Sequence, residues 1–146
     1  MKKIMDDSRP PTHVVTRLVK SEDLNHHGTL FAGRNAEWFV EAGFIAAAGI
    51  TSPANVLCVN IHGLVFKKPV PSGSIIRYES RIVKAGRTSL LAYIQVFLQN
   101  DMRLLVDGFL TFVHVDREGR PFPHGVSVPE TQENRPILER FRTISA

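Results

Sequence analysis

The sequence predicts an α+β fold in which an antiparallel β-sheet wraps around one long central helix. Two observations predict it: one uninterrupted helical segment stands early in the chain, and long β-type segments joined by short polar turns follow it. A length of 146 residues suits one domain, so residues 1–146 are treated as such. Within this domain, residues 1–11 have the composition of a loose N-terminal arm, and residues 125–146 that of a peripheral C-terminal tail.

The central helix is predicted from about Ala32 to Ala48, where Ala, Glu, Trp, Phe and Ile follow one another without a proline. Gly49 stands where a C-terminal cap is expected. One stripe at helical spacing should pack against the sheet, and its members are Phe31, Trp38, Ala42, Ile45 and Gly49. Four further residues widen this apolar surface, so the helix is expected to be covered on most sides: Phe39, Gly43, Ala46 and Ala47.

The β-type segments are rich in β-branched residues and are bounded by turn-forming residues. One precedes the helix and four follow it, at residues 12–19, 56–66, 74–85, 89–99 and 103–115. Short polar connections join the last three, which predicts antiparallel neighbours. Residues 136–144 have the composition of a further short helix. Since one helix cannot cover the open edges of such a sheet, pairing of two copies is expected.

Composition and charge narrow the classes of function. The net charge is +4, which suits either nucleic acid or a small polyanion, but the basic residues are scattered and do not alternate with stacking aromatic residues. The apolar stretches are too short to span a bilayer, and the first residues lack the apolar run of a signal peptide. Cys58 is the single cysteine, so an internal disulfide is impossible. We therefore expect a cytoplasmic protein that binds neither nucleic acid nor membranes.

Four motifs occur together in a recognisable order. They are Asn25–Gly33 followed by Trp38, Val65–Val70 followed by Gly73, the turn Gly86-Arg87-Thr88-Ser89, and Phe112–Asp116 closed by Gly119-Arg120-Pro121. On these motifs, over about residues 14–124, the sequence resembles the hotdog-fold acyl-CoA thioesterases. The likeness is to the acyl-CoA hydrolase branch, which includes brain acyl-CoA hydrolase and its bacterial single-domain relatives.

The resemblance implies the hotdog fold and an enzyme that hydrolyses an acyl-CoA thioester to a free carboxylic acid and coenzyme A. It implies that coenzyme A enters as part of the substrate and leaves as product, without a separate cofactor. It also implies a homodimer that assembles further, into a tetramer or a hexamer. The six histidines lack the spacing of metal ligands, so we predict no metal site.

The family pattern is incomplete in one important respect. The acid that the family places seven residues after its second glycine is here Val40, and the only acids on the helix are Glu37 and Glu41. A non-catalytic acyl-CoA-binding or regulatory protein on the same fold is therefore the alternative to an enzyme. A dehydratase is disfavoured, because the His-Phe-Pro stretch typical of those enzymes is absent from the sequence.

Thioester hydrolysis needs a polarised carbonyl, a positioned water and a carboxylate that acts as base or nucleophile. The helix start at Gly33 offers free N–H groups to the carbonyl. The resemblance assigns contact with the carbonyl or the water to Asn25, whose alternative role is to cap a turn. Glu41, nearest to the family's acid position, is the predicted base and Glu37 the second candidate. Either glutamate can instead belong to a solvated helix edge.

Residues that bind the substrate are predicted at the loop before the helix and at two places associated with coenzyme A. The set consists of His27, Gly28, Phe31, Lys67, Gly86, Arg87, Thr88 and Ser89. For coenzyme A, the resemblance points to the last four and to the strand before Pro69, where Lys67 and Lys68 can add positive charge. In the turn, a guanidinium suits a phosphate and the hydroxyls can bind pantetheine. Each position also has a plain structural alternative, such as a polar hairpin turn or a loop histidine bonded to the backbone.

Overall fold

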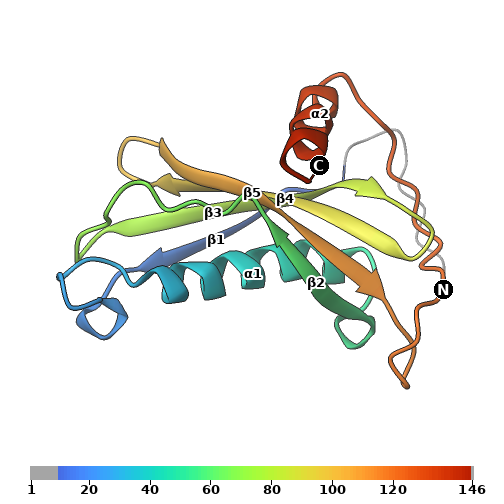
Figure 1. Cartoon of the computed structure of the whole chain (residues 1–146), viewed down its shortest axis with the longest axis horizontal. Helices are drawn as coiled ribbons and strands as arrows, with labels where there is room; N and C mark the ends of the chain where they lie inside the picture. The colour runs from blue at the N-terminus through green and yellow to red at the C-terminus, as the bar shows by residue number, and fades with distance from the viewer. Residues whose placement is uncertain (1–9, 146) are drawn as a thin grey trace.

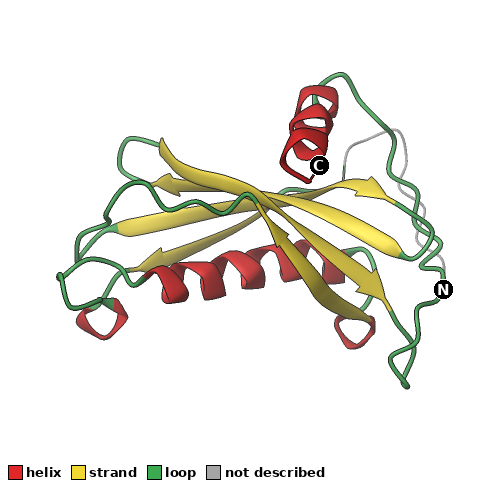
Figure 2. Cartoon of the chain, in the orientation of Figure 1, coloured by secondary structure: helices red, strands yellow, loops and turns green. Residues whose placement is uncertain are grey.

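Five antiparallel strands form one sheet, with two α-helices on its faces (Figure 1; Figure 2). The computed structural model describes residues 10–145, so most of the predicted N-terminal arm lies outside the described residues. The strands are β1 (His13–Leu18), β2 (Val56–His62), β3 (Ile75–Ala85), β4 (Ser89–Leu98) and β5 (Arg103–His114). Their order in the sheet is β1-β3-β4-β5-β2, which leaves β1 and β2 at the edges. The predicted α+β class is confirmed.

The helices agree with the sequence prediction, with small differences at their ends. Helix α1 covers Ala32–Gly49 and helix α2 covers Asn134–Ser145. Strand β2 is shorter than predicted, because the chain leaves the sheet at Gly63, whose φ of 73° belongs to the left-handed region. The segment from there to β3 is an extended loop that passes close to the start of α1.

Helix α1 packs lengthwise on one face of the sheet (Figure 1). Its buried residues are Asn35, Trp38, Phe39, Ala42, Gly43, Ala46 and Ala47. A Cβ at Gly43 would lie 2.3 Å from the side chain of Leu110, so this glycine permits the close approach of helix and sheet. The predicted stripe is partly wrong: Phe31 and Ile45 are 55% and 41% exposed, and Gly49 is exposed as well. The residues expected to widen it, Phe39, Gly43, Ala46 and Ala47, are all buried.

Helix α2 covers part of the opposite face. Leu138 of α2 packs into a second apolar cluster with the sheet residues Val83, Leu91, Tyr93 and Phe109. A salt bridge accompanies this cluster: Arg140 of α2 pairs with Asp107 of β5. The C-terminal segment is thus anchored on the sheet, on the face that α1 leaves free.

The two groups of predicted site residues lie at opposite ends of the sheet. Leu18 pairs with Ile75 at one end, and the loop between β1 and α1 starts there. The β3–β4 turn, beyond the pair Ala85 and Leu90, lies at the other end. Figure 1 shows the first loop on the left and the β3–β4 turn on the right, with α1 extended between them.

Candidate active site

Asn25 organises the loop that leads into α1. Its Oδ1 accepts hydrogen bonds from the N–H groups of His27 at 2.9 Å and Thr29 at 3.2 Å, and its Nδ2 donates to the Thr29 hydroxyl at 3.1 Å. Gly28, with φ of 81°, completes the turn in a conformation that favours glycine. The turn-capping role of Asn25 is therefore present in the structure, and its side chain also lines a cavity beside the helix.

The first turn of α1 presents unsatisfied backbone donors. Within residues 10–145, the N–H groups of Ala32 and Gly33 have no acceptor, and the N-cap residue Phe31 makes no capping hydrogen bond through its side chain. A Cβ at Gly33 would lie 2.6 Å from the ring of Phe31, so the glycine lets that ring lie across the helix start. Free N–H groups and the helix dipole together favour a carbonyl oxygen or an anion at this point.

A cavity of about 260 Å³ lies beside these donors. Its lining includes Asn25, Thr29, Ala32, Asn35, Lys67 and Lys68. The loop between β2 and β3 forms the other wall. A 2.8 Å hydrogen bond from the N–H of Leu30 to the carbonyl of Val70 joins this loop to the chain just before α1. The structure thus brings Asn25 and Lys67, which were predicted from different motifs, into one cavity.

Asn35 is a cavity residue that the sequence analysis missed. Its side chain is 5% exposed, and its Oδ1 accepts a 2.6 Å hydrogen bond from the hydroxyl of the fully buried Tyr78. Burial raises the pKa of Tyr78, against a smaller opposite effect from the charge of Arg17, so the hydroxyl stays protonated and donates. A signal was present in the sequence, because Asn35 shares a helical stripe with the apolar residues Trp38 and Ala42.

The two predicted acids do not line this cavity. The carboxylate of Glu41 pairs with Arg17 of β1, and that of Glu37 pairs with Arg34 at 3.2 Å. The side chains of Glu41 and Glu37 are 51% and 58% exposed. Val40 is half-buried against the main core. Within one chain, the structure therefore brings neither glutamate into the cavity with Asn25.

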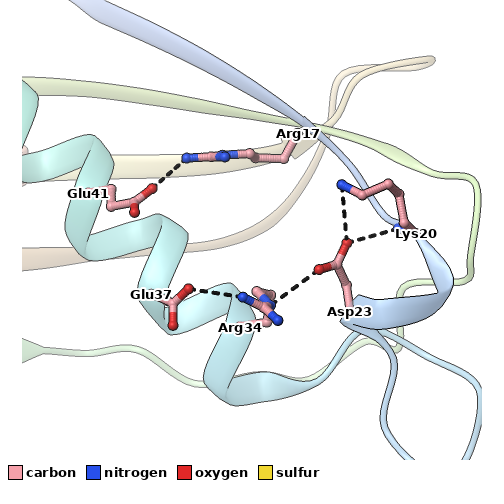
Figure 3. Close-up of polar contacts among 6 residues, drawn as sticks. All are labelled: Arg17, Lys20, Asp23, Arg34, Glu37 and Glu41. Atoms are coloured by element: carbon pink, nitrogen blue, oxygen red, sulfur yellow. Dashed lines mark hydrogen bonds and ion pairs between the residues drawn. The ribbon is translucent and has the colours of Figure 1, made fainter.

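A buried acid, Asp23, was also missed by the sequence analysis. Its side chain is 4% exposed, accepts a 2.9 Å hydrogen bond from the N–H of Lys20, and pairs with Arg34 at 3.2 Å (Figure 3). The carbonyl of Asp23 accepts a hydrogen bond from the N–H of Phe31. This residue therefore fixes the loop against the first turn of α1, and Arg34 links it to Glu37.

The predicted coenzyme A turn lies far from the helix start. Gly86 and Ser89 line a separate hollow of about 260 Å³ on the side of α2, together with Lys84. The 11 residues of β3 separate the two places, which at about 3.3 Å per residue is roughly 35 Å. Arg87 is exposed and Thr88 half-buried. Within a single chain, this turn and Asn25 do not meet.

The predicted residues of the loop before α1 are spread over its outer side. His27 is exposed and its ring lies 3.9 Å from that of His26. Phe31 is exposed at the helix start, and Gly28 serves the turn. Neither His27, Gly28 nor Phe31 lines the 260 Å³ cavity.

Residues 10–145 contain neither a metal-binding cluster nor a membrane-spanning helix. No group of three or more His, Cys, Asp and Glu side chains there is arranged to hold a metal ion. No helix in that range is long and apolar enough to cross a bilayer. The absence of a metal from the working protein stays a prediction.

Comparison with known proteins identifies the family. The model of the thioesterase superfamily matches residues 27–105, which include the helix start, the cavity lining except Asn25, and the β3–β4 turn. The chain belongs to the thioesterase superfamily. An uncharacterised acyl-CoA thioester hydrolase of Bacillus subtilis is 31% identical over 124 residues, which cover 82% of this chain and 72% of that protein.

Solved structures of other family members have the same fold. An apo-hexameric acyl-CoA thioesterase superposes with a TM-score of 0.76 at 29% identity, covering 90% of this chain and 86% of the other. An acyl-CoA hydrolase of Staphylococcus aureus, solved in complex with butyryl coenzyme A, coenzyme A and coenzyme A disulfide, gives a TM-score of 0.71 at 27% identity, covering 90% and 84%. The predicted hotdog fold is confirmed.

Proposed function

We propose that this thioesterase superfamily member is an acyl-CoA thioesterase that binds its thioester at the N-terminus of α1. It hydrolyses the thioester to a free carboxylic acid and coenzyme A. The observation that carries the proposal is the pair of unpaired N–H groups of Ala32 and Gly33 beside a cavity lined by Asn25. The kinship to acyl-CoA thioester hydrolases supports the choice of substrate.

The helix start polarises the reacting carbonyl. The thioester oxygen accepts hydrogen bonds from Ala32 and Gly33, and the dipole of α1 stabilises the negative charge that develops on it. Water attacks the carbonyl carbon, the C–S bond breaks, and the sulfur leaves as the thiol of coenzyme A after protonation. Asn25, held by Thr29, orients the water or the carbonyl from the other side of the cavity.

A carboxylate must take the proton of the attacking water and return one to the sulfur. Glu37 is our first candidate, because it is one helical turn from Gly33, whereas Glu41 is two turns away. In direction around the helix, Glu37 lies about 60° from Val40 and Glu41 about 100°. Arg34 holds the Glu37 carboxylate near the helix start. This reverses the order predicted from the sequence, which put Glu41 first as the residue closest to the family's acid position; Glu41 becomes the second candidate.

Two copies of the chain complete the binding site in this proposal. Strand β2 is a sheet edge whose Leu57, Val59 and Ile61 are 52%, 57% and 46% exposed, which is an unfavourable surface for an isolated chain. A twofold axis perpendicular to the sheet would pair β2 with its copy and reverse the ends of the sheet. The second copy's turn Gly86–Ser89 then lies at the same end as Asn25. Coenzyme A is bound between the copies, with Lys67 near the thioester end.

We expect the homodimer to assemble further, because an acyl-CoA thioesterase of the same fold is a hexamer. We place the protein in the cytoplasm, because Cys58 is a free, exposed thiol and a reducing compartment preserves it. Coenzyme A takes part as substrate and product. We propose that the protein uses no metal or other cofactor and binds neither nucleic acid nor membranes.

A non-catalytic acyl-CoA-binding protein is the second candidate function. Val40 stands where the family has its acid, and both glutamates of α1 are paired with arginines on the exposed side of the helix. A thioester would bind at the same helix start in that case. No water would be activated.

Thiol release from purified protein separates the two functions. We expect free thiol from acyl-CoA substrates at a rate well above the blank without protein, and a loss of that rate in Asn25→Ala. Calorimetric binding of coenzyme A is measured in parallel. Binding without thiol release at any chain length would support the second candidate, and absence of both would contradict each of them.

A further inference from the structure

Asn35 places an unpaired hydrogen-bond donor in the wall of the cavity beside the α1 N-terminus. Its side chain is 95% buried, since only 5% is exposed, and it lines the cavity. Oδ1 is occupied by the hydroxyl of Tyr78, whereas no residue between 10 and 145 accepts a hydrogen bond from Nδ2. Nδ2 is therefore free to donate to an acceptor in the cavity, which a bound molecule can supply in place of water.

Tyr78 fixes which end of the Asn35 amide faces the cavity. The tyrosine is fully buried in the core, and the edge of its ring packs against Trp38 with centroids 6.5 Å apart. Because its hydroxyl donates to Oδ1, Nδ2 is directed away from it. The cavity is the open space next to the Asn35 side chain, so Nδ2 is presented there.

The position of Asn35 relates it to the acyl part of the substrate. Asn35 follows Ala32 by three residues, which is about 4.5 Å along the helix axis. A carbonyl oxygen held by Ala32 and Gly33 therefore has this donor a few atoms further into the cavity. The cavity measures about 260 Å³, and its lysines Lys67 and Lys68 add positive charge. A short chain with an oxygen fits this lining better than a long hydrocarbon.

We infer that Asn35 makes this chain selective for short acyl-CoA thioesters whose acyl group carries an oxygen a few atoms from the thioester carbonyl. The inference rests on the proposed function and names its substrate class. The acceptor is a hydroxyl or a carboxylate oxygen, and both receive the hydrogen bond from Nδ2. A site built to bond such an oxygen discriminates against the analogue that lacks it, because Nδ2 is then left unpaired.

Three four-carbon substrates test this selectivity: butyryl-CoA, 3-hydroxybutyryl-CoA and succinyl-CoA. Thiol release gives kcat/KM for each, against a blank without protein. We expect kcat/KM for at least one of the oxygen-bearing substrates to exceed that for butyryl-CoA by about tenfold, the effect of one hydrogen bond to a buried donor. The faster of the two identifies the acceptor as hydroxyl or carboxylate.

The variant must remove the donor without leaving a new buried polar group. Asn35→Leu alone leaves the Tyr78 hydroxyl unpaired, so the double variant Asn35→Leu/Tyr78→Phe is used, in which both partners become apolar. Its preference for the oxygen-bearing substrate should disappear. Ser80→Ala is the matched control, because it removes another buried bond between β3 and α1, a 2.7 Å contact to the carbonyl of Ala42, away from the cavity. Its substrate preference should match that of the unaltered protein.

Equal kcat/KM for all three substrates, or a preference that survives in the double variant, would overturn the inference while leaving the proposed function intact. If no substrate releases thiol, the proposed function fails. The calorimetric affinities of the protein for the same three thioesters then test whether Asn35 selects the oxygen-bearing ones. Tighter binding of an oxygen-bearing thioester, lost in the double variant, supports the inference. Equal affinities contradict it.

Discussion

Glu37 and Glu41 occupy successive turns of α1, and each is held by a different arginine (Figure 3). Arg17 reaches Glu41 from β1 and also lies 5.5 Å from the centre of the Trp38 ring. Arg34 reaches Glu37 from within the helix. These contacts give the two carboxylates different surroundings, so one substitution at each separates their roles.

Replacement of Glu37 by Gln should lower kcat about 100-fold and change KM little, because the variant loses the group that takes the proton from water. Steady-state thiol release measures both constants. Glu41→Gln is the matched control, one turn away and similarly exposed to solvent, and should keep kcat within about twofold. A full rate in Glu37→Gln together with a loss in Glu41→Gln would make Glu41 the base, and full rates in both would exclude them.

Single residues were predictable where a local motif carries them. The Asn25 loop and the glycine at the helix start follow from short sequence patterns, and both lie where the patterns put them. Asn35 was missed because its meaning depends on Tyr78, a partner 43 residues away on another element. The surroundings of Glu41 could not be predicted for the same reason, since Arg17 is supplied by β1. The partner of Glu37 is local, because Arg34 lies three residues earlier in the same helix.

At the scale of elements, periodicity predicted type better than orientation. The long α1 and the alternating strands give clear signals, whereas the rotation of α1 on the sheet depends on how residues such as Gly43 fit against Leu110. The predicted stripe therefore included the exposed Phe31 and Ile45. The packing of α2 on the sheet could not be predicted either, because its apolar residues are few and their partners lie on three strands.

The anchoring of α2 depends on a polar cluster as well as on apolar contacts. Asp107 accepts hydrogen bonds from Arg140 and, at 2.6 Å, from the hydroxyl of Tyr93. Burial raises the pKa of Asp107, but the hydrogen bonds from Arg140 and Tyr93 outweigh it and the net pKa is lowered. A lowered pKa in the folded state stabilises the fold above the unfolded value of about 3.9, and that stabilisation is lost as the pH falls through the folded value.

Replacement of Asp107 by Asn should therefore reduce the free energy of unfolding by about 1–2 kcal/mol at pH 7, near the lower figure because Arg140 is 44% exposed. The difference from the unaltered protein should stay constant down to about pH 4 and shrink below it. Urea unfolding at fixed protein concentration measures it. Glu118→Gln, in an exposed pair with Arg120, is the control and should change stability little. Equal stabilities at pH 7 would contradict the role given to Asp107.

At the scale of the whole molecule, the two groups of predicted site residues lie at opposite ends of the sheet. The helix start with Asn25 lies at one end of the sheet, and the turn Gly86–Ser89 lies at the other. The sequence predicted both sets of residues and the open edges of the sheet. It could not predict their separation, because only the strand register and the direction of α1 determine which ends meet. The exposed β2 edge supports an arrangement in which a second copy supplies the missing end.

A crystal structure with an inert analogue of butyryl-CoA tests the account most directly. In the analogue, a methylene group separates the sulfur from the carbonyl, so hydrolysis is blocked. We predict a carbonyl oxygen roughly 2.7–3.1 Å from the backbone nitrogens of Ala32 and Gly33, with the nucleotide end against the second copy's turn Gly86–Ser89. A carbonyl bound elsewhere, such as in the hollow beside α2 that Arg140 and Asp107 line, would contradict the assignment of the active site to the α1 N-terminus.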